Sequence, residues 1–341
     1  MALAITDIVD LTIASQKFYD PNKFTDLSTD LTNFPAFEKL MKSSETQDGT
    51  EISVNLLNAN SGQTIWRSMD SVDNYAIVDG LKTGTTQWRH ANWNWSIDER
   101  ETAVNSGKAT KILDLLKVRR HQAWVNAAEK FEAAFWSKPT DSTDVQTYHG
   151  LRNYIVSNST EGFNGGNASG FTTGNIFNSS TITRWKNFTN QYTNISMSDL
   201  VRKIRRAQRL TYFEPPVDAS EARKIGTKFE IYTNIDGITE AEELVAAQND
   251  NLGTDLDKYN GTVMIGKCPV RRAATLDADT QDPFLGINWD ALGYVFLDGR
   301  KAKEAKPRIH PNDHLKMVVD VDNSGNLICR NRRALFTVNK A

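Results

Sequence analysis

The spacing of apolar residues changes from two to three or four close to Glu99, and this change constrains the fold more than any other feature. Before Glu99, apolar and polar residues alternate in two runs, Ile52-Val54-Leu56 and Ala91-Trp93-Trp95-Ile97. Such alternation is typical of strands with one solvent-exposed face. We therefore predict a long hairpin over residues 50–97, with a polar tip around Asp79 to Thr86. A lone hairpin of that length is barely stable in water, so it needs a surface to lie on.

After the change, apolar residues recur every three or four positions from about Glu99 to Trp136. No proline interrupts the pattern before Pro139, and Gly107 is its one weak point. At 1.5 Å per residue, ~30 to 35 residues make a helix of about 45 to 55 Å. Arg119 and Arg120 break the apolar stripe, which argues against a coiled coil. A helix of this length directly after a hairpin is an unusual order of elements.

Composition excludes several classes of protein. The 341 residues are 39% hydrophobic, and 40 basic residues face 42 acidic ones, so the chain is globular and carries no strong net field for a polyanion or an anionic membrane. The first residues lack a basic segment ahead of an apolar one, and no window is apolar enough to span a bilayer. We expect a protein that stays in a cytosol without membrane contact. Two cysteines are too few for a disulfide framework.

The second half of the chain predicts an α+β domain with a mainly antiparallel sheet. Residues 140–197 are rich in Asn, Ser, Thr and Gly and suggest loops. A helix capped by Ser198 follows and ends before Pro215, and a later helix shows capping-box spacing between Thr239 and Glu242. Alternating runs then recur to the C-terminal end, with a hairpin turn predicted over residues 322–325.

Motifs for catalysis or cofactors give little support to an enzyme. The glycine-rich segment at residues 162–171 lacks the Gly-Lys-Ser/Thr of a phosphate loop. His310, Asp313 and His314 could ligate a metal and support a hydrolase, but Pro311 disfavours the helix that would align them. No serine-nucleophile or zinc-protease motif is present. We expect a non-enzyme without cofactor or metal.

One predicted helix carries a dense basic face. Its members alternate with apolar residues and are Arg202, Lys203, Arg205, Arg206 and Arg209. This face could contact nucleic-acid phosphates, or it could be solvated with some arginines paired to acidic neighbours. The same two interpretations apply to Arg330, Arg332 and Arg333.

The order of elements resembles one family: the major capsid proteins of tailed bacteriophages, whose Hong Kong 97 fold is shared by encapsulins. The stretches that carry the resemblance are TEISVNLLN to WNWSID, the long helix to FEAAFW, HGLRNYIVSNSTEGFNGGNASGF, KFEIYTNIDGITEAEELVAA, GTVMIGKCPV and LICRNRRALF. The resemblance covers nearly the whole chain and is loosest over residues 1–50.

The resemblance implies an α+β Hong Kong 97-type fold with five segments. These are an N-terminal arm (1–49), an extended loop (50–97), a spine helix with a peripheral domain (98–194), a mainly axial domain (195–320) and a C-terminal return to the peripheral domain (321–341). It also implies a structural role, in which pentamers and hexamers of the chain close into an icosahedral shell around double-stranded DNA in the bacterial cytoplasm. Expected partners are a portal, scaffolding or decoration proteins, and DNA held by non-specific contact.

Candidate sites follow from this expectation. Subunit contacts are predicted at Trp66, Lys82, Trp88, Trp93 and Trp95, where aromatic side chains give large contact area at low entropic cost. Trp93 and Trp95 could equally be core residues of their own subunit. The basic helix is the candidate DNA-facing patch. Some relatives cross-link a loop lysine to an asparagine of another subunit, but no partner asparagine for Lys82 can be matched. Some relatives also carry a long scaffolding segment ahead of the arm, and we expect none here.

Two alternatives remain open from the residues alone. An encapsulin-type compartment would keep the fold and enclose an enzyme. A sequence-independent nucleic-acid-binding protein would use the basic helix directly and bind DNA as a soluble subunit with steep salt dependence.

Overall fold

The computed structural model describes residues 28–59, 66, 68–69, 79–98, 100–101, 109–212, 228–247, 263–266 and 268–341. Most of the predicted arm, much of the predicted loop and the first turns of the predicted spine helix lie outside these residues. For 109–116 and 245–247 the backbone alone is described.

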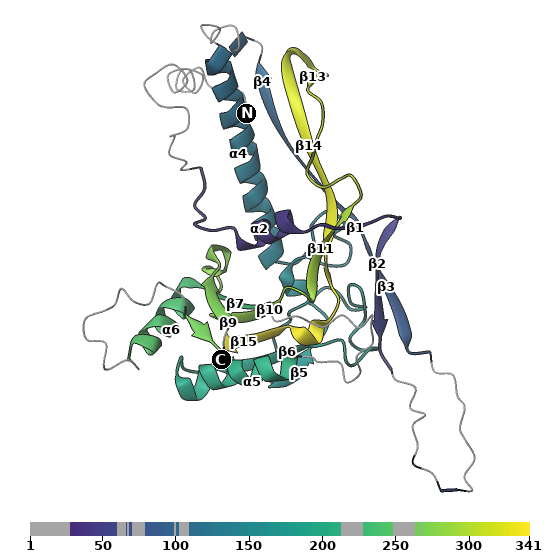
Figure 1. Cartoon of the computed structure of the whole chain (residues 1–341), viewed down its shortest axis with the longest axis vertical. Helices are drawn as coiled ribbons and strands as arrows, with labels where there is room; N and C mark the ends of the chain where they lie inside the picture. The colour runs from purple at the N-terminus through teal and green to yellow at the C-terminus, as the bar shows by residue number, and fades with distance from the viewer. Residues whose placement is uncertain are drawn as a thin grey trace.

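A long helix and two long strands lie side by side and form one end of the molecule (Figure 1). They are α4 (Ala109–Trp136), β4 (Arg89–Asp98) and β14 (Asp313–Cys329). The predicted spine helix is thereby confirmed over 28 residues, about 42 Å. β4 runs antiparallel to β14, from the pair Asp98–Lys316 to the pair Arg89–Gly325. α4 covers β4, so the long helix and the strand before it share one core.

β14 is the central strand of a six-stranded sheet. β11 (Leu292–Leu297) pairs with it antiparallel, and β1 (Glu45–Gln47) pairs with β11 parallel. β12 (Lys303–Glu304), β13 (Arg308–His310) and β4 also pair with β14. The main core lies between this sheet, α4 and α2 (Pro35–Lys42).

A seven-stranded sheet forms the other end of the molecule, in the order β5-β6-β15-β10-β7-β9-β8. α5 (Arg202–Thr211) and α6 (Ile235–Ala247) contribute to a second core on this sheet. α5 packs against β6 and β15, and α6 packs against β9. The strands are β5 (Gly162–Gly165), β6 (Asn187–Tyr192), β7 (Phe229–Thr233), β8 (Met264–Ile265), β9 (Cys268–Arg272), β10 (Phe284–Asn288) and β15 (Phe336–Lys340).

The predicted hairpin is real but smaller than expected. β2 (Glu51–Leu57) pairs with β3 (Leu81–Gln87), so residues 81–86, predicted as the tip, belong to a strand. β4 was predicted as part of the same hairpin, and this is wrong because β4 pairs with β14 over ten residue pairs. Alternation along the chain shows that a strand exists, but it carries no information about a partner more than 200 residues away.

The turn predicted over residues 322–325 is also wrong, since β14 continues through it. The residues that suggested a turn make contacts with other segments of the chain instead. The Asn323 amide oxygen accepts the Ala302 backbone N–H at 3.1 Å, and Ser324 bonds the ring of His90 at 2.8 Å. A Cβ on Gly325 would lie 2.6 Å from the Val295 carbonyl oxygen, so glycine here permits close strand contact.

Both predicted helix starts lie earlier than expected. Ser196, not Ser198, caps the first, and its hydroxyl accepts the Asp199 N–H at 3.2 Å. The cap opens a π-helical turn, η2 (Met197–Val201), that leads into α5. α6 begins at Ile235, where Asn234 accepts the Gly237 N–H at 2.9 Å. Thr239 lies inside this helix and bonds the Ile235 carbonyl. The described residues also form three short 3-10 turns: η1 (Leu151–Asn153), η4 (Ala274–Leu276) and η5 (Arg332–Ala334).

Among the described residues, no helix is both long enough and apolar enough to cross a lipid bilayer.

Candidate functional site

The β2–β3 hairpin lies at the edge of the molecule (Figure 1). Apolar side chains at its outer end are exposed. Leu57 and Leu81 form its last cross-strand pair, and they are 74% and 57% exposed. Trp66, which follows along the chain, is 99% exposed. Lys82, next to Leu81, forms an exposed ion pair with Asp79 at 2.9 Å. Apolar surface left uncovered at the end of a hairpin is typical of a contact site for another molecule.

The three tryptophans closer to α4 lie differently. Trp88 is buried and donates its indole N–H to the Gly49 carbonyl at 2.9 Å. Trp93 is also buried, and its ring meets those of Trp124 and Phe131 edge-on at 5.3 and 5.9 Å. Trp95 is half-buried. Trp88 and Trp93 are therefore core residues of their own subunit, as the second interpretation of Trp93 had it. Trp66 and Lys82 retain the exposure that a contact residue needs.

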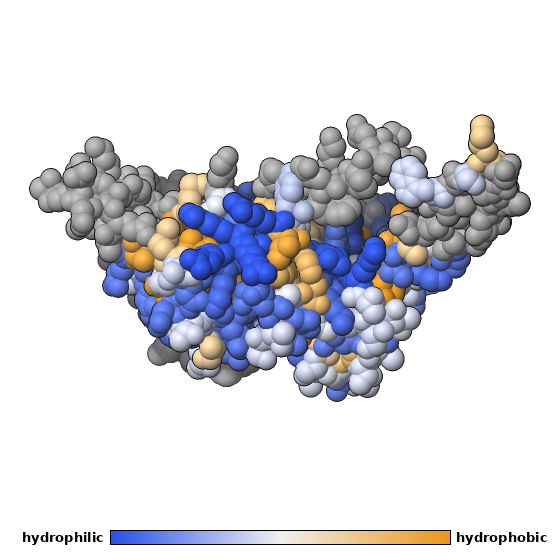
Figure 2. All heavy atoms as spheres, turned by 90° about the horizontal axis from the view of Figure 1, so that it is seen from below, coloured by the Kyte–Doolittle hydropathy of each residue, from blue (hydrophilic) through white to orange (hydrophobic). Residues whose placement is uncertain are grey.

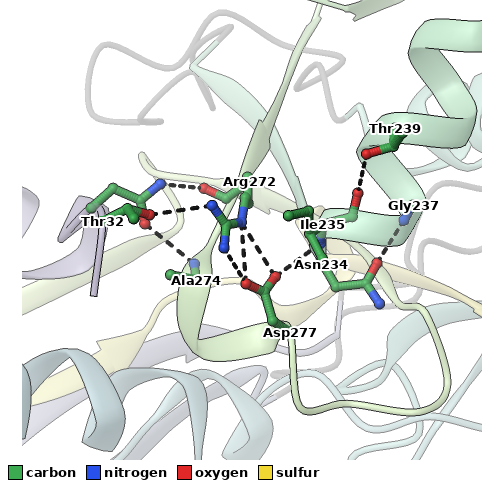
Figure 3. Close-up of polar contacts among 9 residues, drawn as sticks. Thr32, Asn234, Ile235, Gly237, Thr239, Arg272, Ala274 and Asp277 are labelled. Carbon is green, nitrogen blue, oxygen red and sulfur yellow. Dashed lines mark hydrogen bonds and ion pairs between the residues drawn. The ribbon is translucent and has the colours of Figure 1, made fainter. Parts of the chain in front are cut away.

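A polar cluster ties the start of the described chain to α6 (Figure 3). The Asn33 amide donates to the Arg272 carbonyl at 2.8 Å and accepts the Ala274 N–H at 3.2 Å. Arg272 forms an ion pair with Asp277, and Asp277 in turn accepts the Ile235 N–H at 2.8 Å where α6 begins. The backbone N–H at the start of α6 is thus held by Asp277, which is itself held by Arg272, and this fixes the start of the helix.

A buried carboxylate joins α2 to α4. Glu132 is 1% exposed, and one of its oxygens accepts the N–H groups of Ala36 and Phe37, both at 3.0 Å. Its other oxygen accepts the Trp136 indole N–H at 2.6 Å. Burial raises the pKa of Glu132, while these three donors act in the opposite direction. The arrangement caps the N-terminus of one helix with a side chain of another. The sequence offers no signal for it, because the two helices are about 95 residues apart.

Arg332 is a buried cation, and not one of the phosphate-contacting or solvated cations that the sequence predicted for this run. It is 2% exposed, and burial lowers its pKa to about 10. Its guanidinium donates to the carbonyls of Tyr154 at 2.9 Å and Gly166 at 2.7 Å, and also reaches those of Trp185 and Gly165 and the side chain of Asn187. Arg332 therefore holds loop backbone against β6 and is not available for phosphate contact.

The basic face on α5 exists as predicted. Arg202, Arg205, Arg206 and Arg209 are exposed, and Lys203 is half-buried. Two of the five cations are paired, Arg206 with Glu161 at 2.9 Å and Lys203 with Asp199 at 2.5 Å. Arg202, Arg205 and Arg209 have no ion-pair partner among the described residues. Figure 2 views the lower end of the molecule, where α5 lies, and shows a mainly hydrophilic surface.

The candidate metal ligands do not converge. The His310 ring accepts the Asn312 N–H at 3.2 Å, and Asp313 pairs with Lys316 at 3.3 Å. Within the part of the chain that is described, no three His, Cys, Asp or Glu side chains are grouped as metal ligands.

Comparison with known proteins connects this geometry to solved capsid structures. No family model and no curated protein matches the chain. Solved structures match almost end to end at low identity. The capsid of cyanophage A-1(L) is 12% identical with a TM-score of 0.60, covering 94% of this chain and 96% of that one. The capsid of a native GTA particle is 12% identical with a TM-score of 0.58, covering 95% and 96%.

A third match is the capsid of Myoviridae phage XM1, at 11% identity and a TM-score of 0.53, covering 95% of this chain and 97% of that one. At such identities the likeness concerns the fold alone, and it covers nearly the whole chain. The chain has the α+β Hong Kong 97-type fold of phage capsid proteins.

Proposed function

We propose that this chain is a major capsid protein whose copies assemble into an icosahedral shell around double-stranded DNA. The observation that carries the proposal is the outer end of the β2–β3 hairpin, together with the fold in which it occurs. Large apolar surface is left uncovered at Leu57, Leu81 and Trp66, whereas the inner hairpin residues Ile52 and Val54 belong to the main core. A subunit of an assembly can bury such surface against a neighbour.

Repeated weak contacts suit this role. Each hairpin offers a small apolar area, but the contact recurs in every subunit of a closed particle, so the assembly is stable although a single pair is not. Trp66 and Lys82 are the residues that we propose for this contact, with the half-buried Trp95 as a further candidate. A closed icosahedral shell requires pentamers, and a shell of more than sixty subunits also requires hexamers.

Other partners stay predictions. A portal, scaffolding or decoration proteins, and DNA held by non-specific contact are expected for a phage shell of this kind. The encapsulin alternative predicts the same fold with a protein cargo in place of nucleic acid.

Electron microscopy of the expressed, purified protein tests the proposal. Uniform polyhedral shells or capsomer-sized rings are expected. Dispersed monomers at high protein concentration would contradict it. Shells produced in bacteria that also express a candidate cargo enzyme, and that package this enzyme and no DNA, would favour the compartment alternative.

A further inference from the structure

Two helices of the seven-stranded sheet carry opposite charge. α5 has four arginines and one lysine and no acidic residue. α6, over residues 235–247, has Asp236, Glu240, Glu242 and Glu243 and no basic residue. All four acidic side chains are exposed, as are the four arginines. One sheet therefore presents a basic helix at one position and an acidic helix at another.

The two charged faces do not neutralise each other within the subunit. The described structure contains no ion pair between α5 and α6, and the four α6 carboxylates have no ion-pair partner in it. Lys340 interacts only weakly with this face, because its pKa is raised mainly by its hydrogen bond and ion pair with Asp282 and only secondarily by Glu240 and Asp236. Among the described residues, Arg202, Arg205 and Arg209 of α5 and all four carboxylates of α6 are thus left without an ion-pair partner.

The spacing of the charges matches. Arg202, Arg205 and Arg209 are separated by three and four residues, and Asp236, Glu240 and Glu243 by four and three. Each set lies on one side of its helix and spans seven residues, about 10 Å. Like charges at such spacing destabilise a free helix, and an opposing stripe of the same length removes that cost.

We propose that α5 of one subunit docks against α6 of the next, so that neighbouring copies join through complementary charge. The inference rests on the proposed function and identifies the contact that forms the ring. Because the two faces differ, the contact is heterologous, and repetition of a heterologous contact closes into a ring when the rotation permits. The first turn of α6 is fixed by Asn234 and Asp277, so this helix can present its carboxylates without reorganisation.

A second copy of the chain accounts for the charges of both helices better than a polyanion does. DNA would account for the arginines of α5 but leaves the acidic stripe of α6, on the same sheet, without a purpose and repels it. Docking on a second copy gives both the arginines of α5 and the carboxylates of α6 a partner of opposite charge. Each helix also carries an exposed apolar residue, Leu210 in the last turn of α5 and Ile235 at the start of α6, at 48% and 42% exposure.

Charge exchange tests the contact. In the first variant, Arg202→Glu, Arg205→Glu and Arg209→Glu make both helices acidic. In the second, Glu240→Lys, Glu242→Lys and Glu243→Lys make both basic, with Asp236 kept because a carboxylate stabilises a helix N-terminus. Each variant alone should lose at least ten-fold in ring formation, measured by native mass spectrometry and electron microscopy. A chain with all six substitutions should form rings again.

Mixing the first two variants gives a sharper result. A subunit of the first variant can then dock only on a subunit of the second, so the two must alternate around a ring. Even-membered rings such as hexamers should form, while pentamers should not. A matched control, Lys130→Glu with Lys303→Glu and Lys306→Glu, changes net charge equally at exposed positions elsewhere and should keep the wild-type rings. Circular dichroism of every variant checks that it folds.

These experiments distinguish a failure of the proposed function from a failure of the contact between α5 and α6. If wild type forms no ring or shell, the proposed function fails. If wild type and the first variant both form the same rings, the docking of α5 on α6 is overturned and the proposed function stands. If the first variant also loses copurifying nucleic acid, with no recovery in the six-substitution chain, then α5 binds a polyanion instead.

Discussion

At the scale of single residues, His149 makes the stability of the subunit depend on pH. It is buried, and burial together with the nearby Arg89 guanidinium lowers its pKa from 6.5 to about 3. The folded chain therefore stays unprotonated at His149 at pH values where the unfolded chain takes up a proton. Stability from this residue is complete above about pH 6.5 and falls as the pH drops toward 3.

We expect unassembled wild-type subunits to lose about 2 kcal/mol more between pH 7 and pH 5 than a His149→Gln variant does. Urea unfolding at the two pH values measures this difference. Carboxylates titrate in both proteins and cancel in the comparison. Equal pH dependence in the two proteins would show that His149 is accessible to protons in the folded state.

Arg332 gives a second prediction at this scale. Replacing it with Met removes a buried charge but leaves four carbonyl oxygens without a donor, so we expect a loss of about 3 to 5 kcal/mol. Arg332→Lys keeps one charge with fewer donors and should fall between Met and wild type. The exposed neighbour Arg333→Met is the control, with an expected change under about 1 kcal/mol. Chemical denaturation measures all three, and similar values for Arg332→Met and Arg333→Met would contradict the role described.

The burial of individual residues such as Arg332 could not be predicted from the sequence. Arg330, Arg332 and Arg333 are indistinguishable as letters in one basic run, and only the fold places the middle one against the loop carbonyls. In the same way Trp93 and Trp66 are both tryptophans in polar surroundings, yet one packs on Trp124 and Phe131 and the other is exposed. Burial depends on contacts between residues far apart in the chain, and local composition does not contain them.

At the scale of elements, the contact between α2 and α4 depends on Glu132. Glu132→Gln keeps the shape but replaces one acceptor oxygen with an amide that faces donors, at a site where the carboxylate accepts three N–H groups. We expect a loss of about 2 to 4 kcal/mol. Hydrogen exchange should show that the amides of α2 lose protection first, because their cap is gone.

Glu129→Gln on the same helix is the matched control for this prediction. Glu129 is partly exposed, and its replacement should cost under about 0.5 kcal/mol. If the two variants lose the same stability and α2 stays protected in both, Glu132 does not hold α2.

Periodicity predicted the elements better than it predicted their partners. The change of spacing near Glu99 located β4 and the long α4, and the basic stripe located α5. The partner of β4 was missed because β14 lies far along the chain, and because residues 322–325 have the composition of a turn. Their buried side chains bond to His90 and Ala302 within a continuous strand, so a local turn signal was overridden by tertiary contacts.

At the scale of the whole molecule, the proposed function assigns the two ends of the β2–β3 hairpin to different tasks, folding and assembly. Its inner residues Ile52 and Val54 belong to the main core, whereas Leu57 and Leu81 at the outer end are largely exposed. The outer half thus contributes little burial to its own subunit. If its surface serves a neighbouring copy, its removal should affect the particle and not the fold.

Replacing residues 58–80 with an Asn-Gly turn between Leu57 and Leu81 tests this separation. We expect a subunit whose melting temperature is within about 4 °C of wild type, because Ile52 and Val54, the hairpin residues that belong to the main core, are kept. We expect it to form no closed shell under the electron microscope. Leu57→Ser with Leu81→Ser keeps the length and removes only the apolar pair, so it should assemble more weakly than wild type but better than the truncated chain. Complete shells from the truncated chain would show that subunits join without the hairpin, and the contact surface would then have to lie on α5, α6 or the long edge of α4 and β14.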